Sequence, residues 1–224
     1  MSVPEQREPR GRMDDQDPGG QKKLEGQAGP EGPVEPAGRG KGADADALWR
    51  HARAVSSCVT VMTALYFLVV AFDNLTNPAS NWEFVKGVLS GDGMAEGNGF
   101  EWREIHATWF AAVVYAVVIA GETAAGVLLL HGGACGLLRR ARSAAWERAQ
   151  RTVLAGGVVG LLIFFLGFVV IGGNWFAMYL NDKWNGMDPA FQNTVVVLFT
   201  LVLSLLVSAG GRLATSPSVP GRTR

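Results

Sequence analysis

The sequence is short of three things that many functional sites need: cysteine, histidine and an excess of charge of one sign. It has two cysteines and three histidines, and its 20 basic residues balance its 20 acidic residues. A net charge of zero without a concentrated basic stretch argues against nucleic-acid binding. The sequence has no Cys-x-x-Cys, no phosphate-binding loop and no convincing Ser–His–Asp set. We therefore expect no enzyme activity, no bound metal and no cofactor.

Aromatic residues and long apolar runs are missing from the N-terminal part of the chain. Residues 1–45 contain no aromatic residue, whereas Gly, Pro and charged residues are frequent there. Such a segment buries too little apolar surface to offset the entropy that is lost on ordering. We predict a disordered cytoplasmic tail over residues 1–48. A membrane domain over residues 49–210 and a short cytoplasmic tail over 211–224 should follow it.

Long apolar runs dominate the rest of the chain and predict membrane-spanning helices. A helix needs about 20 residues to cross the hydrocarbon core of a bilayer, and the runs show no period-two alternation that would indicate strands. We predict four spans, over residues 54–72, 107–130, 153–171 and 191–209. The expected fold is an all-α membrane protein, a four-helix transmembrane bundle that has the lipid bilayer as its partner.

The basic residues between the spans predict the orientation of the bundle. Five arginines lie in the connection over residues 131–152, whereas the connections over 73–106 and 172–190 hold two and one basic residues. Because cytoplasmic loops are enriched in Lys and Arg, we predict that both termini are cytoplasmic. Arginine outnumbers lysine by 15 to 5, which is typical of a GC-rich bacterial gene and favours the bacterial plasma membrane.

One acidic residue, Glu122, lies inside a predicted span. An ionisable group in the hydrocarbon is costly and is a candidate functional group. The same depth falls near residues 60–63 and 200–204, where no basic side chain lies, so we expect the carboxyl group to hydrogen-bond a hydroxyl or a backbone carbonyl. This interaction is either a proton relay or a hydrogen bond that fixes packing. The candidate intramembrane site comprises Glu122, Tyr115, Gly160 and Thr200.

Polar and tryptophan residues gather in the two connections predicted to face outward. Tryptophan belts anchor membrane proteins at the headgroups, but the amides and carboxylates around these tryptophans also suit a shallow pocket for a polar ligand, a lipid headgroup or a partner subunit. The candidate outer-face site comprises Asp73, Asn74, Asn81, Trp82, Asn174, Trp175, Trp184 and Asn185.

Three stretches carry a resemblance to a known family. They are VAFDNLT at 70–76, SNWEFV at 80–85 and GFVVIGGNWFAM at 167–178. The sequence resembles, over roughly residues 54–207, the bacterial predicted small integral membrane proteins called domain of unknown function 2165. The resemblance implies four spans and supplies no activity or catalytic residue. This sequence departs from the family pattern at Asp73 and Gly87, where the resemblance implies Asn and His.

Three functions remain open from the sequence. The leading prediction is a non-enzymatic accessory or interaction subunit of a membrane complex, with other membrane subunits as partners. It depends on the outward-facing polar surface and on the absence of a catalytic set. The first alternative is a small proton-coupled transporter that uses Glu122. The second is an intramembrane or quinone-linked enzyme.

Overall fold

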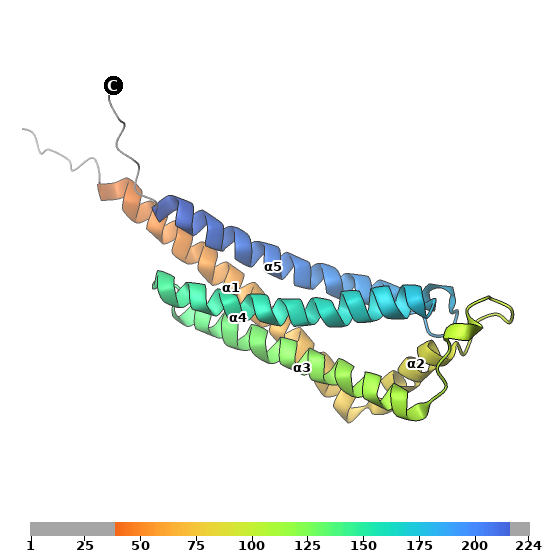
Figure 1. The fold of residues 1–224 in the computed structure, drawn as a ribbon. Coiled ribbons are helices and arrows are strands. Elements are labelled where there is room, and N and C mark those ends of the chain that lie inside the picture. The colour runs from red at the N-terminus through yellow and green to blue at the C-terminus, as the bar shows by residue number, and fades with distance from the viewer. Residues whose placement is uncertain (1–38, 216–224) are drawn as a thin grey trace, which may run out of the picture. The chain divides into compact units, whose positions relative to one another are not determined.

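Long helices lying side by side form the membrane domain (Figure 1). The structure, a computed structural model, describes the backbone of residues 39–215 and the side chains of residues 43–212. The bundle contains α1 (Arg39–Thr76), α3 (Thr108–Leu138), α4 (Ser143–Leu161) continued by η2 (Leu162–Trp175), and α5 (Met187–Thr215). One end of the bundle carries α2 (Pro78–Ser90) and the short turns η1 (Glu101–Arg103) and η3 (Met178–Leu180). The described part of the chain contains no strand.

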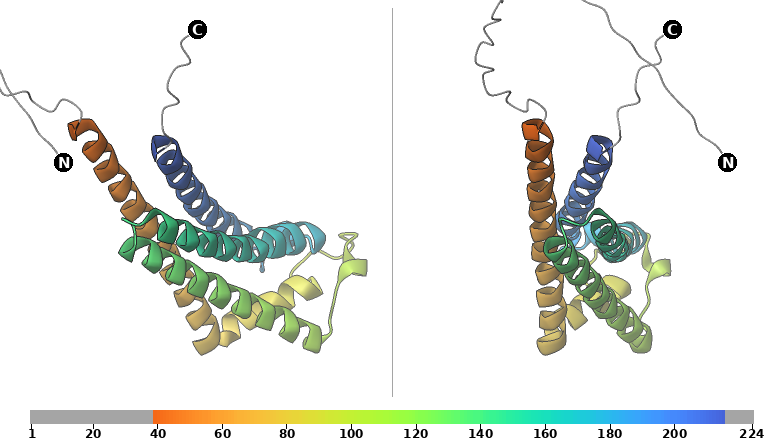
Figure 2. Two further views of the ribbon diagram at one scale, coloured as in Figure 1. Left: turned by 60° about the vertical axis from the view of Figure 1, so that its left-hand side comes forward. Right: turned by 90° about the vertical axis from the view of Figure 1, so that its left-hand side faces the viewer.

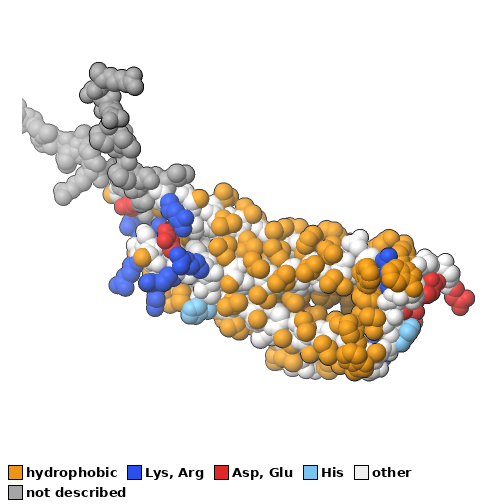
Figure 3. Space-filling model, in the orientation of Figure 1, with side chains coloured by type: hydrophobic (Ala, Val, Ile, Leu, Met, Phe, Trp, Pro, Cys, Tyr) orange, Lys and Arg blue, Asp and Glu red, His pale blue; other side chains and the backbone are white. Residues whose placement is uncertain are grey.

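The prediction of an all-α protein with four spans is confirmed. Within the described residues, four helical segments are long and apolar enough to cross a membrane, namely Ala43–Thr76, Thr108–Leu138, Ser143–Trp175 and Met187–Arg212. Each is longer than the span predicted from the sequence, because the helix continues into polar flanks that hydropathy does not mark. Apolar side chains cover the visible face between the two ends (Figure 3), as a surface in contact with lipid requires.

The N-terminal limit of α1 differs from the predicted limit of the tail. Residues 39–48 fall within the segment predicted to be disordered, but they are helical. The stretch from Ala43 to Leu48 contains Ala, Asp and Leu without Gly or Pro, so it can prolong a helix that the following span already nucleates. The rest of the predicted tail, residues 1–38, and residues 216–224 lie outside the described residues.

The two ends of the bundle carry different charges (Figure 3). One end, which we call the basic end, contains the α3–α4 connection with Arg139, Arg140 and Arg142. The other, which we call the loop end, contains α2, η1, η3 and their connections. Most of the Lys and Arg side chains in this view lie at the basic end, whereas Asp and Glu side chains are visible at both ends (Figure 3).

The half of the bundle next to the basic end is closely packed through glycine. A Cβ atom added to Gly132 would lie 2.7 Å from a methyl carbon of Val153 and 2.9 Å from its backbone nitrogen. A Cβ atom on Gly156 would lie 3.0 Å from the backbone nitrogen of Leu129. Such close approach of backbones is typical of membrane helix pairs. Helices α3 and α4 are thereby held together along the core that contains Leu129 and Val153.

The half next to the loop end is more open, because two spans change course there. Helix α1 ends at Thr76, and Pro78 begins α2, which leaves at a sharp angle (Figures 1 and 2). Proline suits this place because the first turn of a helix needs no backbone donor. Helix α2 ends where Gly91 adopts a left-handed conformation with φ of 68°.

Span three changes its type of helix partway along its length. The span is helical, as predicted, but from Leu162 the backbone follows the wider π-helical turn as far as Trp175. The amide of Phe176 donates to the carbonyl of Ile171, five residues earlier, at 3.0 Å. π-Helical segments occur mostly as short bulges at functional sites. Here the wider turn changes which side chains of span three face α1, α2 and α3.

Candidate functional site

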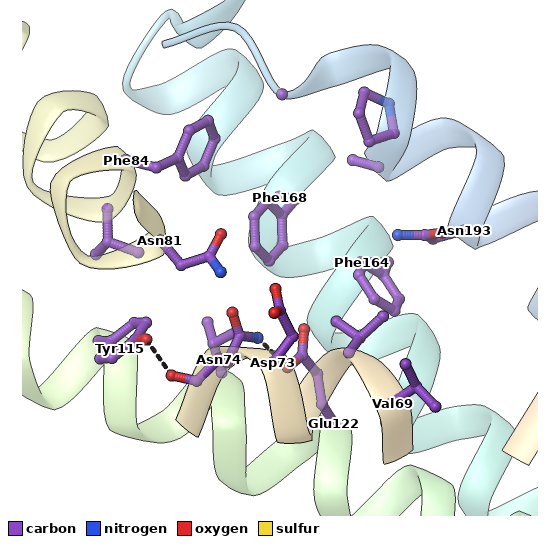
Figure 4. A pocket seen from close by; sticks show the side chains of 16 residues that line it. Val69, Asp73, Asn74, Asn81, Phe84, Tyr115, Glu122, Phe164, Phe168 and Asn193 are labelled. Carbon is purple, nitrogen blue, oxygen red and sulfur yellow. Dashed lines mark hydrogen bonds between the residues drawn. The ribbon is translucent and has the colours of Figure 1, made fainter. Parts of the chain in front are cut away.

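A cavity of about 490 Å³ lies in the open half of the bundle, between α1, α2, α3, η2 and the start of α5. Its wall combines polar groups with apolar and aromatic side chains (Figure 4). The polar residues that line it are Asp73, Asn74, Asn81, Tyr115, Glu122 and Asn193. The aromatic rings that line it, besides Tyr115, are Phe84, Phe164 and Phe168.

Glu122 is 2% exposed and is held on one side of this cavity. The amide nitrogen Nδ2 of Asn74 donates to its Oε2 at 2.6 Å. The hydroxyl of Tyr115 in turn donates to the backbone carbonyl of Asn74 at 2.7 Å. The chain of two hydrogen bonds joins the end of α1 to two positions of α3 that lie seven residues apart. It fixes the direction of the carboxyl group, because both neighbours are themselves held.

The partner of Glu122 is not the one that we predicted. We expected a hydroxyl or a backbone carbonyl near residues 60–63 or 200–204, but the partner is the Asn74 side-chain amide. The prediction assumed that every span begins and ends at the membrane surface. In fact the end of α1 lies beside Tyr115 and Glu122 of α3, so that the Asn74 side chain reaches the carboxyl group.

A second carboxyl group, that of Asp73, faces the same cavity. Figure 4 shows Asp73 and Glu122 rising from neighbouring helices toward the rings of Phe164 and Phe168. No Lys, Arg or His stands among the described residues that line the cavity. An ionised carboxylate in an apolar membrane interior is costly without an opposite charge. The cavity therefore favours a cation over an anion.

Aromatic rings form the opposite wall. The rings of Phe84 and Phe168 are stacked with centroids 6.3 Å apart, and those of Phe164 and Phe168 lie 5.9 Å apart. The faces of aromatic rings carry partial negative charge and attract cations. This wall and the carboxyl groups thus favour the same class of ligand.

The structure brings together some residues of each predicted site. Glu122 and Tyr115, predicted as intramembrane residues, share the cavity with Asp73, Asn74 and Asn81, predicted as outer-face residues. The two predicted sites therefore meet in one place, which the sequence did not indicate.

The other two intramembrane candidates, Gly160 and Thr200, lie away from the cavity lining. A Cβ atom on Gly160 would lie 2.9 Å from the ring of Phe67, so this glycine provides space for close packing. The hydroxyl of Thr200 lies 2.9 Å from the hydroxyl of Thr63 on α1. Both residues serve contacts between helices.

Three other outer-face candidates, Trp82, Trp184 and Asn185, make contacts within the loop end. Trp82 packs edge-on against Tyr115, with ring centroids 5.9 Å apart, and so supports the wall of the cavity from behind. The indole of Trp184 donates to Asp92 at 3.1 Å, and Asn185 accepts from the backbone of Met187 at 3.1 Å. These contacts shape the connection between η3 and α5.

Asn174 and Trp175 form a separate group at the end of η2. The Asn174 amide donates to the carbonyl of Val169 at 2.9 Å. The guanidinium of Arg103 lies 4.8 Å from the ring centroids of both Trp102 and Trp175. These residues therefore do not belong to the cavity.

Sequence reasoning missed Asn193 and the aromatic wall. Asn193 is an amide inside the predicted fourth span, where polar residues are uncommon, so it could have been selected on the same grounds as Glu122. Its Oδ1 accepts from the hydroxyl of Tyr66 at 2.6 Å. Phe164 and Phe168 gave no comparable signal, because phenylalanine in an apolar run is expected on every face of the helix.

The fold and the cavity define an integral membrane protein, a bundle of four spans that encloses a polar site. A family model described as "predicted small integral membrane protein", the domain of unknown function 2165, matches residues 52–207. The chain belongs to this family, as the resemblance in the sequence suggested. Comparisons with curated proteins and with solved structures found no match to this chain.

Proposed function

We propose that this protein is a non-enzymatic membrane protein whose cavity binds a small organic cation. The observation that carries the proposal is the pair of carboxyl groups, Asp73 and Glu122, that face one cavity of mixed polar and apolar lining, in which none of the described lining residues is basic. A bound ammonium or guanidinium group would supply the missing positive charge. The aromatic wall would contact the apolar part of such a ligand and stabilise its charge.

The size of the cavity favours an organic cation over a metal ion. Metal ligands surround the ion at about 2.0–2.6 Å, so a metal site is small and densely lined by oxygen atoms. The cavity has about 490 Å³, which falls in the range of small-molecule pockets. Among the described residues, no group of three or more His, Cys, Asp and Glu side chains is placed to hold a metal ion.

The proposal includes an orientation in the membrane. Cytoplasmic loops of membrane proteins are enriched in Lys and Arg. We therefore infer that the basic end, with Arg139, Arg140 and Arg142, is cytoplasmic and that the loop end is outside. We propose that both termini are cytoplasmic, that the membrane is the bacterial plasma membrane and that the ligand enters from outside. Cysteine substituted at exposed Glu96 or at exposed Ser143 and labelled by an impermeant maleimide in intact cells tests this orientation. Labelling at residue 96 alone is expected, and labelling at residue 143 alone would reverse the orientation.

Calorimetry on the full chain in lipid nanodiscs tests cation binding directly. Phenethylammonium should bind, whereas neutral 2-phenylethanol should not. Asp73→Asn and Glu122→Gln should each weaken binding by about tenfold or more, which corresponds to about 1.4 kcal/mol, because each removes one of the two carboxylates that face the bound cation. Glu83→Gln is the matched control, because Glu83 is exposed on α2 and pairs with Lys86 at 3.2 Å. Equal binding by wild type and Asp73→Asn would refute the proposal.

A second proposal concerns the role in the cell, and the exposed aromatic cluster at the loop end supports it. Trp102 is 70% exposed and Trp175 is 50% exposed, their rings meet edge-on, and the guanidinium of Arg103 lies 4.8 Å from the centroid of each ring. Tryptophan and arginine are the residues that most often dominate protein interfaces. We propose that this cluster contacts another subunit and that the protein is an accessory subunit whose cavity senses or holds the cation.

Purification from the native membrane in mild detergent tests the accessory role. A partner should accompany the wild type in constant proportion, and Trp102→Ala with Trp175→Ala should release it. Trp109→Ala is the control, because Trp109 is equally exposed at 70% but lies outside this cluster. If the protein instead purifies alone and imports phenethylammonium into vesicles, it is a transporter and the accessory role fails.

A further inference from the structure

A second hollow adjoins the cavity and opens on the face of the bundle between α3 and η2. It has about 450 Å³, and the described residues that line it are apolar or aromatic, with no charged side chain among them. We call it the lateral groove. Its lining includes Val113 and Val117 on α3 and Leu162, Leu166 and Ile171 on η2. Figure 3 shows the surface hollowed here, among apolar side chains.

The groove and the cavity meet at residues that line both. These shared residues are Phe84, Val85, Val118 and Phe168. The rings of Phe84 and Phe168, with centroids 6.3 Å apart, border both the cavity that contains the carboxyl groups and the groove. A polar cavity and an apolar groove therefore adjoin along these four side chains.

We infer that the ligand is an amphipathic amine, with its ammonium group in the cavity and a hydrocarbon chain in the lateral groove. This inference rests on the proposed cation binding and names the class of cation. The groove lies within the spanning segments of α3 and η2, so a chain seated in it stays at hydrocarbon depth. At this depth the methylene groups stay out of water and make van der Waals contacts with valine, leucine and phenylalanine, which add to the attraction at the carboxyl groups.

A substitution at Gly167 can test whether the groove binds the ligand. It lines the groove, and a Cβ atom added there would lie 3.5 Å from its nearest neighbour, the carbonyl of Leu162, which is ordinary contact. A larger side chain at this position would therefore fill the groove without displacing the backbone. Gly167→Leu is the blocking variant. Ala124→Leu is its control, because Ala124 is exposed on α3 and lines neither space.

The probe is dodecylamine with a diazirine near the end of its chain, added to the full-length protein in nanodiscs and activated by light. Peptide mapping should place the adducts on the groove segments of α3 and η2, and excess phenethylammonium should compete. Gly167→Leu should reduce the groove adducts by about tenfold, whereas Ala124→Leu should leave them unchanged. Gly167→Leu should retain wild-type affinity for phenethylammonium, which shows that the cavity is intact.

The outcomes separate this inference from the proposed function. If phenethylammonium binds and Asp73→Asn weakens it, but the dodecylamine adducts scatter over the lipid-facing surface, the inference is overturned and the proposed function stands. Equal labelling of the groove by the matching dodecanol probe, without competition, would mean that the groove holds ordinary bilayer chains and would also overturn the inference. Absence of phenethylammonium binding to the wild type overturns both.

Discussion

The half of the bundle at the basic end and the half at the loop end are built from similar apolar residues but pack in different ways. Near the basic end, glycines of α3 and α4 bring backbones close together, and the space between the helices is filled. Near the loop end, α1 stops at Thr76 and η2 follows a wider turn, so that the helices separate around polar groups. The comparison shows that one half is filled by close helix packing, whereas the other leaves the space in which we propose that a cation binds.

The largest effect should follow from breaking the packed half. Gly132→Leu places atoms where Val153 and the carbonyl of Ala149 already lie, with a Cβ contact of 2.7 Å to the Val153 side chain and 3.0 Å to that carbonyl. Overpacking against backbone costs about 1–3 kcal/mol or more, so we expect the high end of this range. Unfolding by titration with sodium dodecyl sulfate in mixed micelles measures it. Gly167→Leu, in the open half, should leave stability nearly unchanged, and equal losses would remove the distinction between the halves.

A smaller effect should follow from breaking the hydrogen bond in the open half. Asn74→Leu leaves the buried Glu122 carboxyl group without its donor, which costs about 1–3 kcal/mol. Replacing both partners, Asn74→Leu with Glu122→Leu, should recover part of this loss, because an apolar pair leaves no unsatisfied group. The same unfolding titration gives the coupling energy. Additive losses in the double variant would show that the two side chains do not interact.

The hydroxyl pair between α1 and α5 should matter less. The hydroxyls of Thr63 and Thr200 lie 2.9 Å apart and are buried. Hydrogen bonds between membrane helices average about 0.6 kcal/mol, because the separated helices find other partners. Thr200→Val should therefore destabilise the bundle by about this amount without changing cation binding. A loss of phenethylammonium affinity in this variant would mean that the site extends toward the packed half.

The smallest effect concerns the connections at the loop end and depends on pH. Hydrogen bonds from the Lys183 ammonium and from the Trp184 indole hold the pKa of Asp92 below its ordinary value of 3.8. Because the folded pKa is lowered, the link is present above pH 3.8 and is lost as pH falls below it. The nuclear magnetic resonance signal of the Trp184 indole should follow this titration. Asp92→Asn should abolish the titration, and a step that persists in this variant would assign it to another group.

The sequence predicted the class of fold because that prediction depends on local composition alone. Apolar runs of about 20 residues indicate membrane-spanning helices, wherever those helices later pack. The arginines between the runs predict the orientation of the helices. Glu122 was also found from the sequence, since an acid within an apolar run is conspicuous. Its partner Asn74 was predicted for a different site, because the sequence does not show that the end of α1 packs beside Glu122 of α3.

The sequence by itself determined the set of spans. It also identified the ionisable residue, Glu122, whose burial in a membrane is energetically costly. The tertiary structure alone decided which residues meet. Asp73 and Glu122 line one cavity because the end of α1 packs beside α3, and Phe84 and Phe168 face them because α2 and the π-helical η2 lie opposite. Hydropathy is a property of each segment, whereas a cavity is a property of the angles and end points of several helices at once.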